Sequence, residues 1–352
     1  MDNPETSLST DQAQYIEGDR VAVLLPLPLS GSYDYLVPAS MALKTGDFVV
    51  VPLGARKSNG VVWGPGQDDV PIHKMKTVLE VLETPPLPEV SARFVDWVAA
   101  YTLSPPGAVL KMVMSVPDAL QPPKPVLALT LALELPDFKM TKARERAIKV
   151  LQEGPGDLPR LPTEIAREAG VSASVIKGLV DAGVFLAHNL SPQNTDLNQP
   201  DPETPGFGLS SAQSEAAKTL CNAVKSQKFS VHVIDGVPGS GKTEVYFEAI
   251  AETLRAGKQA LVLLPEIALG AQWRKRFAAR FGCPPLEWHS DLSPARRRDI
   301  WRRVVRGGPM AIVGARSALF LPYPNLGLIV ADEEHDAAYK QEEGVIYNGR
   351  DM

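Results

Sequence analysis

Eight residues in the last third of the chain restrict the possible folds more than any other feature of the sequence. Residues 236–243 match the pattern GxxxxGK[ST] at every position. The motif requires a strand before it and a helix after it, because its glycines let backbone N–H groups close around phosphate oxygens at the positive end of a helix. A strand over residues 231–234 and a helix over residues 242–255 meet that requirement, so we expect a phosphate-binding loop rather than a plain glycine-rich turn. The loop residues are Gly236, Val237, Pro238, Gly239, Ser240, Gly241, Lys242 and Thr243.

An acidic cluster follows the last predicted strand of the chain. Residues 332–335 have the sequence Asp-Glu-Glu-His. Asp332 stands where a carboxylate would hold Mg²⁺, and Glu333 stands where a general base could polarise an attacking water. Lys242 would reach the β- and γ-phosphates, and Thr243 would offer its hydroxyl to the ion. Together these residues predict a Mg-ATP site, although the acidic cluster alone fits a solvated helix start.

Residues 208–352 alternate between apolar strands and helical segments. The strand segments are nearly all apolar, which is typical of a parallel sheet covered by helices on both faces. This order predicts a doubly wound α/β domain. Strands are expected over residues 231–234, 260–264, 310–313 and 326–330, and helices over residues 242–255, 267–281 and 294–306.

Two further blocks precede this domain. Residues 20–122 are rich in valine, leucine and proline and predict a small β-rich domain, after a disordered N-terminus over residues 1–19. Residues 140–190 have the order helix, turn, helix and extended segment, which fits either a winged helix or a generic helical linker domain. Residues 191–207 contain several prolines and predict a flexible linker. The expected elements are strands over 21–25, 47–52 and 60–63, and helices over 92–101, 142–152, 162–168 and 172–181, the last with Ser172 as N-cap.

The composition is that of a multidomain soluble protein. With 352 residues, 44% hydrophobic and 22% charged, the chain has room for about two or three domains. Its longest apolar runs are too short to span a bilayer and its first residues carry no secretory signal, so we expect a cytoplasmic protein without membrane contact. Cys221 and Cys283 lie far apart, which excludes a disulfide framework and a cysteine zinc site in this chain.

Charge alone gives no support for nucleic-acid binding, because the net charge is −5. Arginine and lysine do concentrate between residues 274 and 306. They form either a patch for a DNA backbone or the solvated outer faces of two helices.

The phosphate loop together with Asp-Glu-Glu-His resembles the first, RecA-like motor lobe of superfamily 2 helicases. Residues 264–269 (Leu-Pro-Glu-Ile-Ala-Leu) resemble motif Ia, and residues 313–320 (Val-Gly-Ala-Arg-Ser-Ala-Leu-Phe) resemble motif Ib. In that superfamily these loops face the DNA backbone, which implies a DNA contact for Arg316. Gln213, ahead of the phosphate loop, is either the glutamine that recognises adenine or an ordinary surface residue.

Taken together, these motifs are similar to those of the PriA family, and so is the first block. Residues 23–28, the trio Tyr33, Asp34 and Tyr35, and residues 46–54 resemble the domain that captures the 3′ end of a nascent DNA strand. The resemblance implies that the trio lines a pocket for the terminal nucleotide, with stacking faces and a carboxylate acceptor. The alternative is a strand with two packing tyrosines and a turn-capping aspartate.

The resemblance implies an ATP-dependent 3′–5′ DNA helicase that recognises stalled or branched replication forks and initiates primosome assembly. It implies ATP and Mg²⁺ as cofactors, branched DNA with a 3′ nascent end as ligand, and primosome and single-strand-binding proteins as partners. Family members also bind zinc, but the ligands are absent from this chain. A second hypothesis is a fork-end DNA-binding module that binds ATP without acting as a motor.

Several positions depart from the family pattern. Ala315 stands where the family usually has threonine, and Val345 and Asn348 replace an aromatic residue and a histidine in the aromatic-rich loop after the acidic cluster. The chain ends at Met352, so we expect it to lack the second motor lobe, the arginine finger and the zinc-binding cysteines. Because such a finger contributes on the order of 10³-fold or more to turnover, we expect this chain not to unwind DNA.

Overall fold

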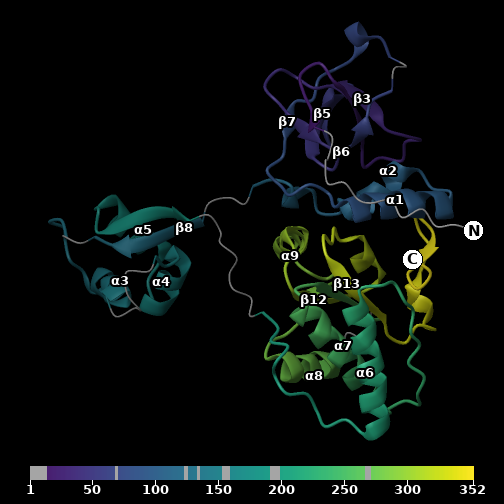
Figure 1. The fold of residues 1–352 in the computed structure, drawn as a ribbon. Coiled ribbons are helices and arrows are strands. Elements are labelled where there is room, and N and C mark those ends of the chain that lie inside the picture. The colour runs from purple at the N-terminus through teal and green to yellow at the C-terminus, as the bar shows by residue number, and fades with distance from the viewer. Residues whose placement is uncertain are drawn as a thin grey trace, which may run out of the picture. The chain divides into compact units, whose positions relative to one another are not determined.

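The structure is a computed structural model, and its fold is drawn in Figure 1. It describes residues 14–67, 70–122, 126–132, 135–152, 159–190, 199–265 and 271–352. By its internal contacts the chain divides into two units. Met1–Pro122 and Asn198–Met352 form the larger unit, and Pro123–Leu197 form the smaller one.

The first part of the larger unit is an antiparallel sheet of five described strands, in the order β3-β2-β6-β5-β7. It confirms the strands predicted over residues 21–25, 47–52 and 60–63. Valines of these strands fill a common core, and Gly60 allows this packing, because a Cβ there would lie 2.6 Å from Cγ1 of Val23. The strands are β2 (Arg20–Leu24), β3 (Tyr33–Leu36), β5 (Phe48–Leu53), β6 (Arg56–Pro65) and β7 (Glu80–Val81).

A separate pair of short strands flanks the hairpin of β2 and β3 in the sequence. β1 (Gln14–Tyr15) pairs with β4 (Leu43–Lys44), and Tyr15 is buried in the valine core. We expected residues 1–19 to be disordered. Residues 1–13 lie outside the described residues, but for residues 14 and 15 the expectation is wrong, because pairing and burial hold them in place.

Two helices complete this part, α1 (Glu89–Thr102) and α2 (Pro106–Val113). α1 contains the helix predicted over residues 92–101 and begins earlier, directly after Pro88. α2 packs closely on the segment after β2, because a Cβ at Gly107 would lie only 2.1 Å from the carbonyl oxygen of Leu27.

The second part of the larger unit, the lobe, is built on a parallel sheet in the order β11-β12-β10-β13. The sheet confirms the strands predicted over residues 260–264, 310–313 and 326–330. α7 and α8 pack on one face of the sheet, and Figure 1 shows α9 on the other side. The strands are β10 (Gln259–Leu263), β11 (Leu286–Trp288), β12 (Met310–Gly314) and β13 (Leu326–Ala331), and the helices are α7 (Lys242–Arg255), α8 (Ala271–Phe281) and α9 (Pro294–Arg306). Residues 266–270, where the predicted helix over 267–281 begins, lie outside the described residues.

The strand predicted over residues 231–234 is wrong. The segment forms no strand: Val231 and Val233 lie in solvent, 78% and 87% exposed, and Ile234 packs partly buried against the core of the lobe. Among the described strands, β13 pairs only with β10, so its other edge is open and this segment does not join it. Apolar composition favours a strand, but a strand forms only where the backbone pairs with a neighbour.

Sequence analysis did not predict α6 (Ser211–Ser226), which packs against α7. Its start has a capping box: the Ser210 hydroxyl accepts from the backbone N–H of Gln213, and the Gln213 side chain accepts from the backbone N–H of Ser210. This pattern is visible in the sequence and marks a helix start.

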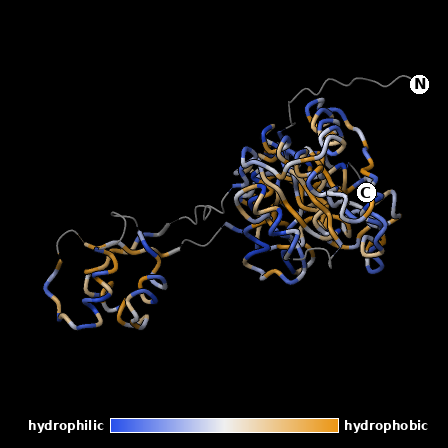
Figure 2. The backbone as a smooth tube through the Cα atoms, turned by 90° about the horizontal axis from the view of Figure 1, so that it is seen from below, coloured by the Kyte–Doolittle hydropathy of each residue, from blue (hydrophilic) through white to orange (hydrophobic). Residues whose placement is uncertain are grey.

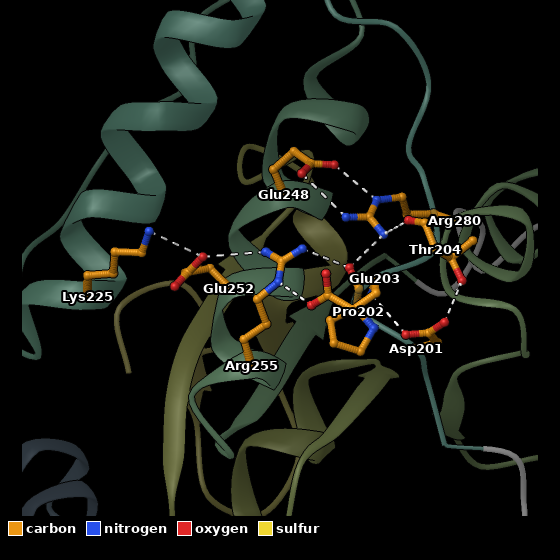
Figure 3. A network of polar contacts seen from close by, with 9 residues as sticks. All are labelled: Asp201, Pro202, Glu203, Thr204, Lys225, Glu248, Glu252, Arg255 and Arg280. Atoms are coloured by element: carbon orange, nitrogen blue, oxygen red, sulfur yellow. Dashed lines mark hydrogen bonds and ion pairs between the residues drawn. The ribbon is translucent and has the colours of Figure 1, made fainter.

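A network of polar contacts fixes the segment that leads into the lobe (Figure 3). The Arg280 guanidinium, with only 2% of its side chain exposed, pairs with Glu248 at 3.0 Å and donates to the carbonyl oxygen of Thr204 at 2.6 Å. Arg255 pairs with Glu203 at 2.7 Å. The expectation of a flexible linker over residues 191–207 is therefore wrong for residues 201–204, which are held on the lobe, and residues 191–198 lie outside the described residues.

Helix α9 joins the two parts of the larger unit. The Trp301 indole N–H donates to the carbonyl oxygen of Val113 at 2.9 Å, and its ring contacts Phe48 edge-on. Arg302 donates to the carbonyl oxygens of Asp118 and Ala119, each at 2.9 Å. Of the basic residues between 274 and 306, Arg280 and Arg302 thus belong to internal contacts rather than to solvated outer faces or a DNA patch.

The smaller unit contains three helices and a strand pair within its described residues. α3 (Lys142–Gln152), α4 (Pro162–Ala169) and α5 (Ala173–Asp181) confirm the predicted helices. β8 (Val126–Leu131) pairs antiparallel with β9 (Phe185–Leu190), so the unit begins before the predicted residue 140. Ser172 occupies the N-cap of α5, but its hydroxyl contacts the Ser174 hydroxyl instead of the backbone.

Figure 2 shows apolar positions along the inner elements of both units and polar positions along their outer loops. Among the described residues, no helix combines the length and the apolar content needed to cross a bilayer.

The buried guanidinium of Arg280 generates a stability prediction. In Arg280→Ala, Glu248 and the carbonyl oxygen of Thr204 lose their charged donor, and breaking such a buried pair costs about 3 kcal/mol or more. Arg274→Ala, on the same helix, removes a half-exposed pair with Glu287 at 3.5 Å and should cost less than about 1 kcal/mol. Urea unfolding of both variants measures the two losses. Equal losses would mean that Arg280 does not anchor the lobe.

Candidate active site

The parallel sheet brings the predicted site residues to one edge. β13 ends at Ala331, which pairs with Leu263 at the end of β10, and the backbone N–H of Asp332 donates to the carbonyl oxygen of Leu263 at 3.1 Å. Helix α7 begins at Lys242, directly after the phosphate loop, and packs against β10 and β13. The carboxyl ends of the strands and the N-terminus of α7 therefore face the same region, as in other α/β nucleotide sites.

The loop over residues 236–241 has the backbone that a phosphate cradle needs. Gly239 and Gly241 adopt left-handed conformations, with φ of 81° and 83°, which residues with a Cβ rarely adopt. A Cβ at Gly236 would lie 2.6 Å from the Ser240 hydroxyl, so the loop closes too tightly for any other residue. Gly241 is the N-cap of α7 and supplies no side-chain cap, which leaves the first N–H groups of the helix to an anion.

The Lys242 ammonium folds back onto this loop. It donates to the carbonyl oxygen of Gly236 at 2.7 Å. This contact holds the positive charge at the centre of the cradle, where a phosphate would replace the carbonyl oxygen as its acceptor.

Asp332 is oriented through both of its carboxylate oxygens. Oδ2 accepts from the Tyr246 hydroxyl at 2.8 Å, and Oδ1 accepts from the backbone N–H of Glu333 at 3.1 Å. The Tyr246 oxygen in turn accepts from the Trp273 indole N–H at 2.8 Å. Burial, and after it the Asp332 carboxylate, raises the pKa of Tyr246 well above its usual value, so the phenol keeps its proton.

Glu333 lies in a strained conformation next to Asp332. Its φ is 48°, in the left-handed region that residues with a Cβ avoid. Its side chain is 52% exposed, and the carboxylate lies 3.7 Å from the imidazole of His335. The carboxylate thus reaches solvent beside Asp332.

The residues present fit a magnesium-bound nucleotide. Mg²⁺ keeps several waters and takes few protein ligands, with the phosphates supplying the others. Thr243 and Asp332 provide a hydroxyl and a carboxylate of that kind. The described part of the chain contains no group of three or more His, Cys, Asp or Glu side chains that could hold a metal ion.

Gln213 lies beside the phosphate loop, and both ends of its amide make hydrogen bonds within the chain. Its Nε2 donates to the carbonyl oxygen of Ser240 at 2.8 Å, and its Oε1 accepts from the backbone N–H of Ser210 at 2.8 Å. In this conformation the side chain supports the loop and caps α6, and its contact with an adenine stays a prediction.

Arg316 holds the segment after the acidic cluster. Its guanidinium donates to Oε1 of Gln341 at 2.8 Å and to the carbonyl oxygen of Ala338 at 2.6 Å. The direct DNA contact expected of Arg316 stays a prediction. Residues 266–269 of the predicted motif Ia lie outside the described residues.

The aromatic residues of this segment are buried. The Tyr339 hydroxyl lies 2.6 Å from the carbonyl oxygen of Asp332 and 2.9 Å from that of Leu263, so it can donate to either. Tyr347 packs edge-on against Phe320, and burial raises its pKa to about 12. These contacts tie the segment to the end of β13.

The three residues predicted to line a DNA-end pocket differ in their exposure to solvent. Tyr33 is 43% exposed, whereas Tyr35 is buried in the valine core and donates to the carbonyl oxygen of Pro52 at 3.1 Å. The prediction of a stacking face at Tyr35 is therefore wrong, because its side chain is only 4% exposed. Asp34 accepts from the backbone N–H of Gln67 at 2.7 Å.

Sequence analysis missed Tyr246 and Trp273. Tyr246 follows Thr243 by three positions, so the two lie on the same face of α7, and this spacing was a usable signal. Trp273 offers no such signal, because its contact with Tyr246 depends on the packing of α8 against α7.

Comparisons with known proteins show which families the chain resembles. Residues 22–115 match the family described as the 3′DNA-binding domain (3′BD), and residues 210–351 match the family described as DEAD/DEAH box helicase. The chain is 32% identical over 333 residues to the replication restart protein PriA of Rickettsia felis, covering 94% of this chain and 39% of the relative. It is 34% identical over 344 residues to that of Haemophilus influenzae, covering 94% of this chain and 46% of the relative.

A third relative, the replication restart protein PriA of Bacillus subtilis, is 37% identical over 191 residues, which cover 54% of this chain and 24% of the relative. The chain thus spans less than half the length of these relatives. The two matched domains, in this order and with a matching relative across nearly all of the chain, establish that it belongs to the PriA family.

Proposed function

We propose that this chain is the fork-recognising and ATP-binding part of a replication restart helicase. The complete protein would unwind DNA in the 3′–5′ direction at stalled or branched forks and start primosome assembly with single-strand-binding and primosome proteins. One observation carries the proposal: a chain with a 3′ DNA-binding domain also has a phosphate loop and an acidic cluster that meet at one sheet edge.

The site residues of the lobe have distinct roles in this proposal. The loop amides and the N-terminus of α7 bind phosphate oxygens, and Lys242 exchanges the carbonyl oxygen of Gly236 for the β- and γ-phosphates. Thr243 and Asp332 hold Mg²⁺, which neutralises phosphate charge when bound. Glu333 orients the attacking water through its solvent-facing carboxylate. The segment that Tyr339 ties to Asp332 connects this chemistry to the DNA-facing side.

The first block would contribute the recognition of a DNA end. Tyr33 offers an exposed ring on which a base can stack, and Asp34, oriented by Gln67, offers an acceptor to the terminal 3′-hydroxyl. Tyr35, buried in the valine core, would hold β3 and with it Tyr33 and Asp34 in place. A 3′-phosphate would meet the Asp34 carboxylate at short range, so this site would select an unmodified end.

The domain arrangement is part of the proposal. Residues 20–122 would be the DNA-end domain, residues 140–190 a winged-helix-like domain and residues 208–352 the ATP-binding lobe. Three helices followed by β9, with β8 beside it, support a winged-helix-like middle domain. The second candidate is a module that binds a fork end and ATP without motor activity.

Lys242→Ala tests the nucleotide site. The variant should bind a fluorescent ADP analogue in the presence of Mg²⁺ at least about tenfold more weakly, because a charged hydrogen bond to phosphate contributes about 1.5–3 kcal/mol. Lys225→Ala is the matched control, since it removes an exposed lysine of α6 that pairs only loosely with Glu252 at 3.6 Å. A fluorescence titration measures both. Equal affinity of Lys242→Ala and the original chain would refute the site assignment.

Asp34→Asn tests the DNA-end site. Asparagine keeps an oxygen for the backbone N–H of Gln67 but removes the charge. The original chain should bind a fork with a 3′-hydroxyl more tightly than one with a 3′-phosphate, and the substitution should reduce this preference about tenfold by removing like-charge repulsion. Phosphate-backbone binding, with its salt dependence, should remain.

The control for this experiment is Asp96→Asn, which makes the same chemical change at a carboxylate that accepts from the Trp63 indole in the same block. Fluorescence anisotropy at fixed salt gives the affinities for the 3′-hydroxyl fork and the 3′-phosphate fork for each protein. If the original chain binds both fork ends equally, Tyr33 and Asp34 have no role in reading the end.

A further inference from the structure

The Tyr246 hydroxyl lies between the two residues proposed to hold Mg²⁺. It donates to Oδ2 of Asp332 at 2.8 Å, and the Thr243 side chain lies close enough to lower its pKa. Thr243 precedes Tyr246 by three positions on α7, and Asp332 follows β13. One hydroxyl group therefore links the helix after the phosphate loop to the strand that carries the acidic cluster.

The hydrogen bonds around this hydroxyl have a fixed direction. The Trp273 indole N–H can only donate, so at 2.8 Å it takes the Tyr246 oxygen as acceptor. A phenol has a single proton, which leaves that proton for the Asp332 carboxylate. Tyr246 is 2% and Trp273 7% exposed, so water has little access to substitute for either partner.

Trp273 is itself held rigidly, which makes its donor a fixed reference point. Its ring stacks on Phe277 with centroids 5.4 Å apart and meets Phe247 edge-on at 5.6 Å. Trp273 and Phe277 belong to α8, and Phe247 belongs to α7. The direction of the Tyr246 hydroxyl is thus set by aromatic packing between two helices.

We propose that Tyr246, oriented by Trp273, is a positioning residue that sets the Asp332 carboxylate and the Thr243 hydroxyl in the arrangement that Mg²⁺ requires. The inference rests on the proposed nucleotide site. Its physical basis is that Mg²⁺ demands near-octahedral geometry at about 2.0–2.1 Å, so a carboxylate that can rotate binds it poorly. Groups that orient metal ligands typically change metal affinity by about 10–100-fold when they are removed.

Tyr246→Phe tests the proposal, because it removes the hydroxyl and keeps the ring. A fluorescent ADP analogue is titrated with Mg²⁺ and, separately, in EDTA. The concentration of Mg²⁺ that gives half of the magnesium-dependent binding should rise about 10–100-fold. Affinity in EDTA should not change, because the phosphate loop and Lys242 are intact. A general structural defect would instead weaken binding equally under both conditions, and that result would overturn the proposal.

Tyr323→Phe is the matched control. Tyr323 is also buried, and its hydroxyl donates to the carbonyl oxygen of Ala318 at 3.0 Å, so the substitution deletes a comparable hydroxyl elsewhere in the lobe. Its magnesium dependence should equal that of the original chain. An equal shift in both variants, or no shift in Tyr246→Phe, would contradict the role of Tyr246.

Trp273→Phe is a second variant for the same titration if Tyr246→Phe does not fold. It keeps the Tyr246 hydroxyl but removes the donor that orients it, so a smaller shift in the same direction is expected. No shift in a folded Trp273→Phe would then refute the proposal. If the original chain itself binds no nucleotide, the proposed function fails, which is a result distinct from a failure of Tyr246 alone.

Discussion

The pairing of β10 with β12 on one side and β13 on the other is the constraint on which the candidate active site depends. Because all three strands run parallel, their carboxyl ends lie at one edge, and Asp332 emerges there next to the end of β10. Helix α7 packs on the same strands and brings its N-terminus, with Lys242 and Thr243, to that edge. If the register of β13 changed by one residue, Asp332 would leave the reach of Tyr246, and the acidic cluster would lose its connection to the phosphate loop.

Sequence patterns within single segments predicted most helices and strands of the lobe. The phosphate loop, α7, α9 and the strands β10, β12 and β13 follow from a motif, from helical composition and from apolar runs. The apolar run over residues 231–234 led to a wrong prediction of a strand. A strand forms only where its backbone pairs with a neighbouring strand, and no local pattern specifies that pairing. α6 was missed even though Ser210 and Gln213 form a capping box that the sequence displays.

Side-chain roles were harder to predict than elements, since they depend on contacts between distant segments. Tyr35 is an aromatic residue of the kind that stacks on bases, but packing against the valines of the sheet buries it in the core. Arg316 and Arg302 have the charge expected of DNA contacts, yet each donates to carbonyl oxygens within the chain. Trp273 contributes through a hydrogen bond to a residue 27 positions away, which only the packing of α7 and α8 reveals.

Hydrogen–deuterium exchange with and without Mg-ADP tests most directly whether the phosphate loop and the acidic cluster form one nucleotide site. Our account predicts slower exchange in two separate segments, residues 236–246 and residues 332–339, because the nucleotide and the ion hold both together. The slowing in the second segment should require Mg²⁺. Protection of the loop alone, whether or not Mg²⁺ is present, would contradict a shared site and leave Asp332 without a part in nucleotide binding.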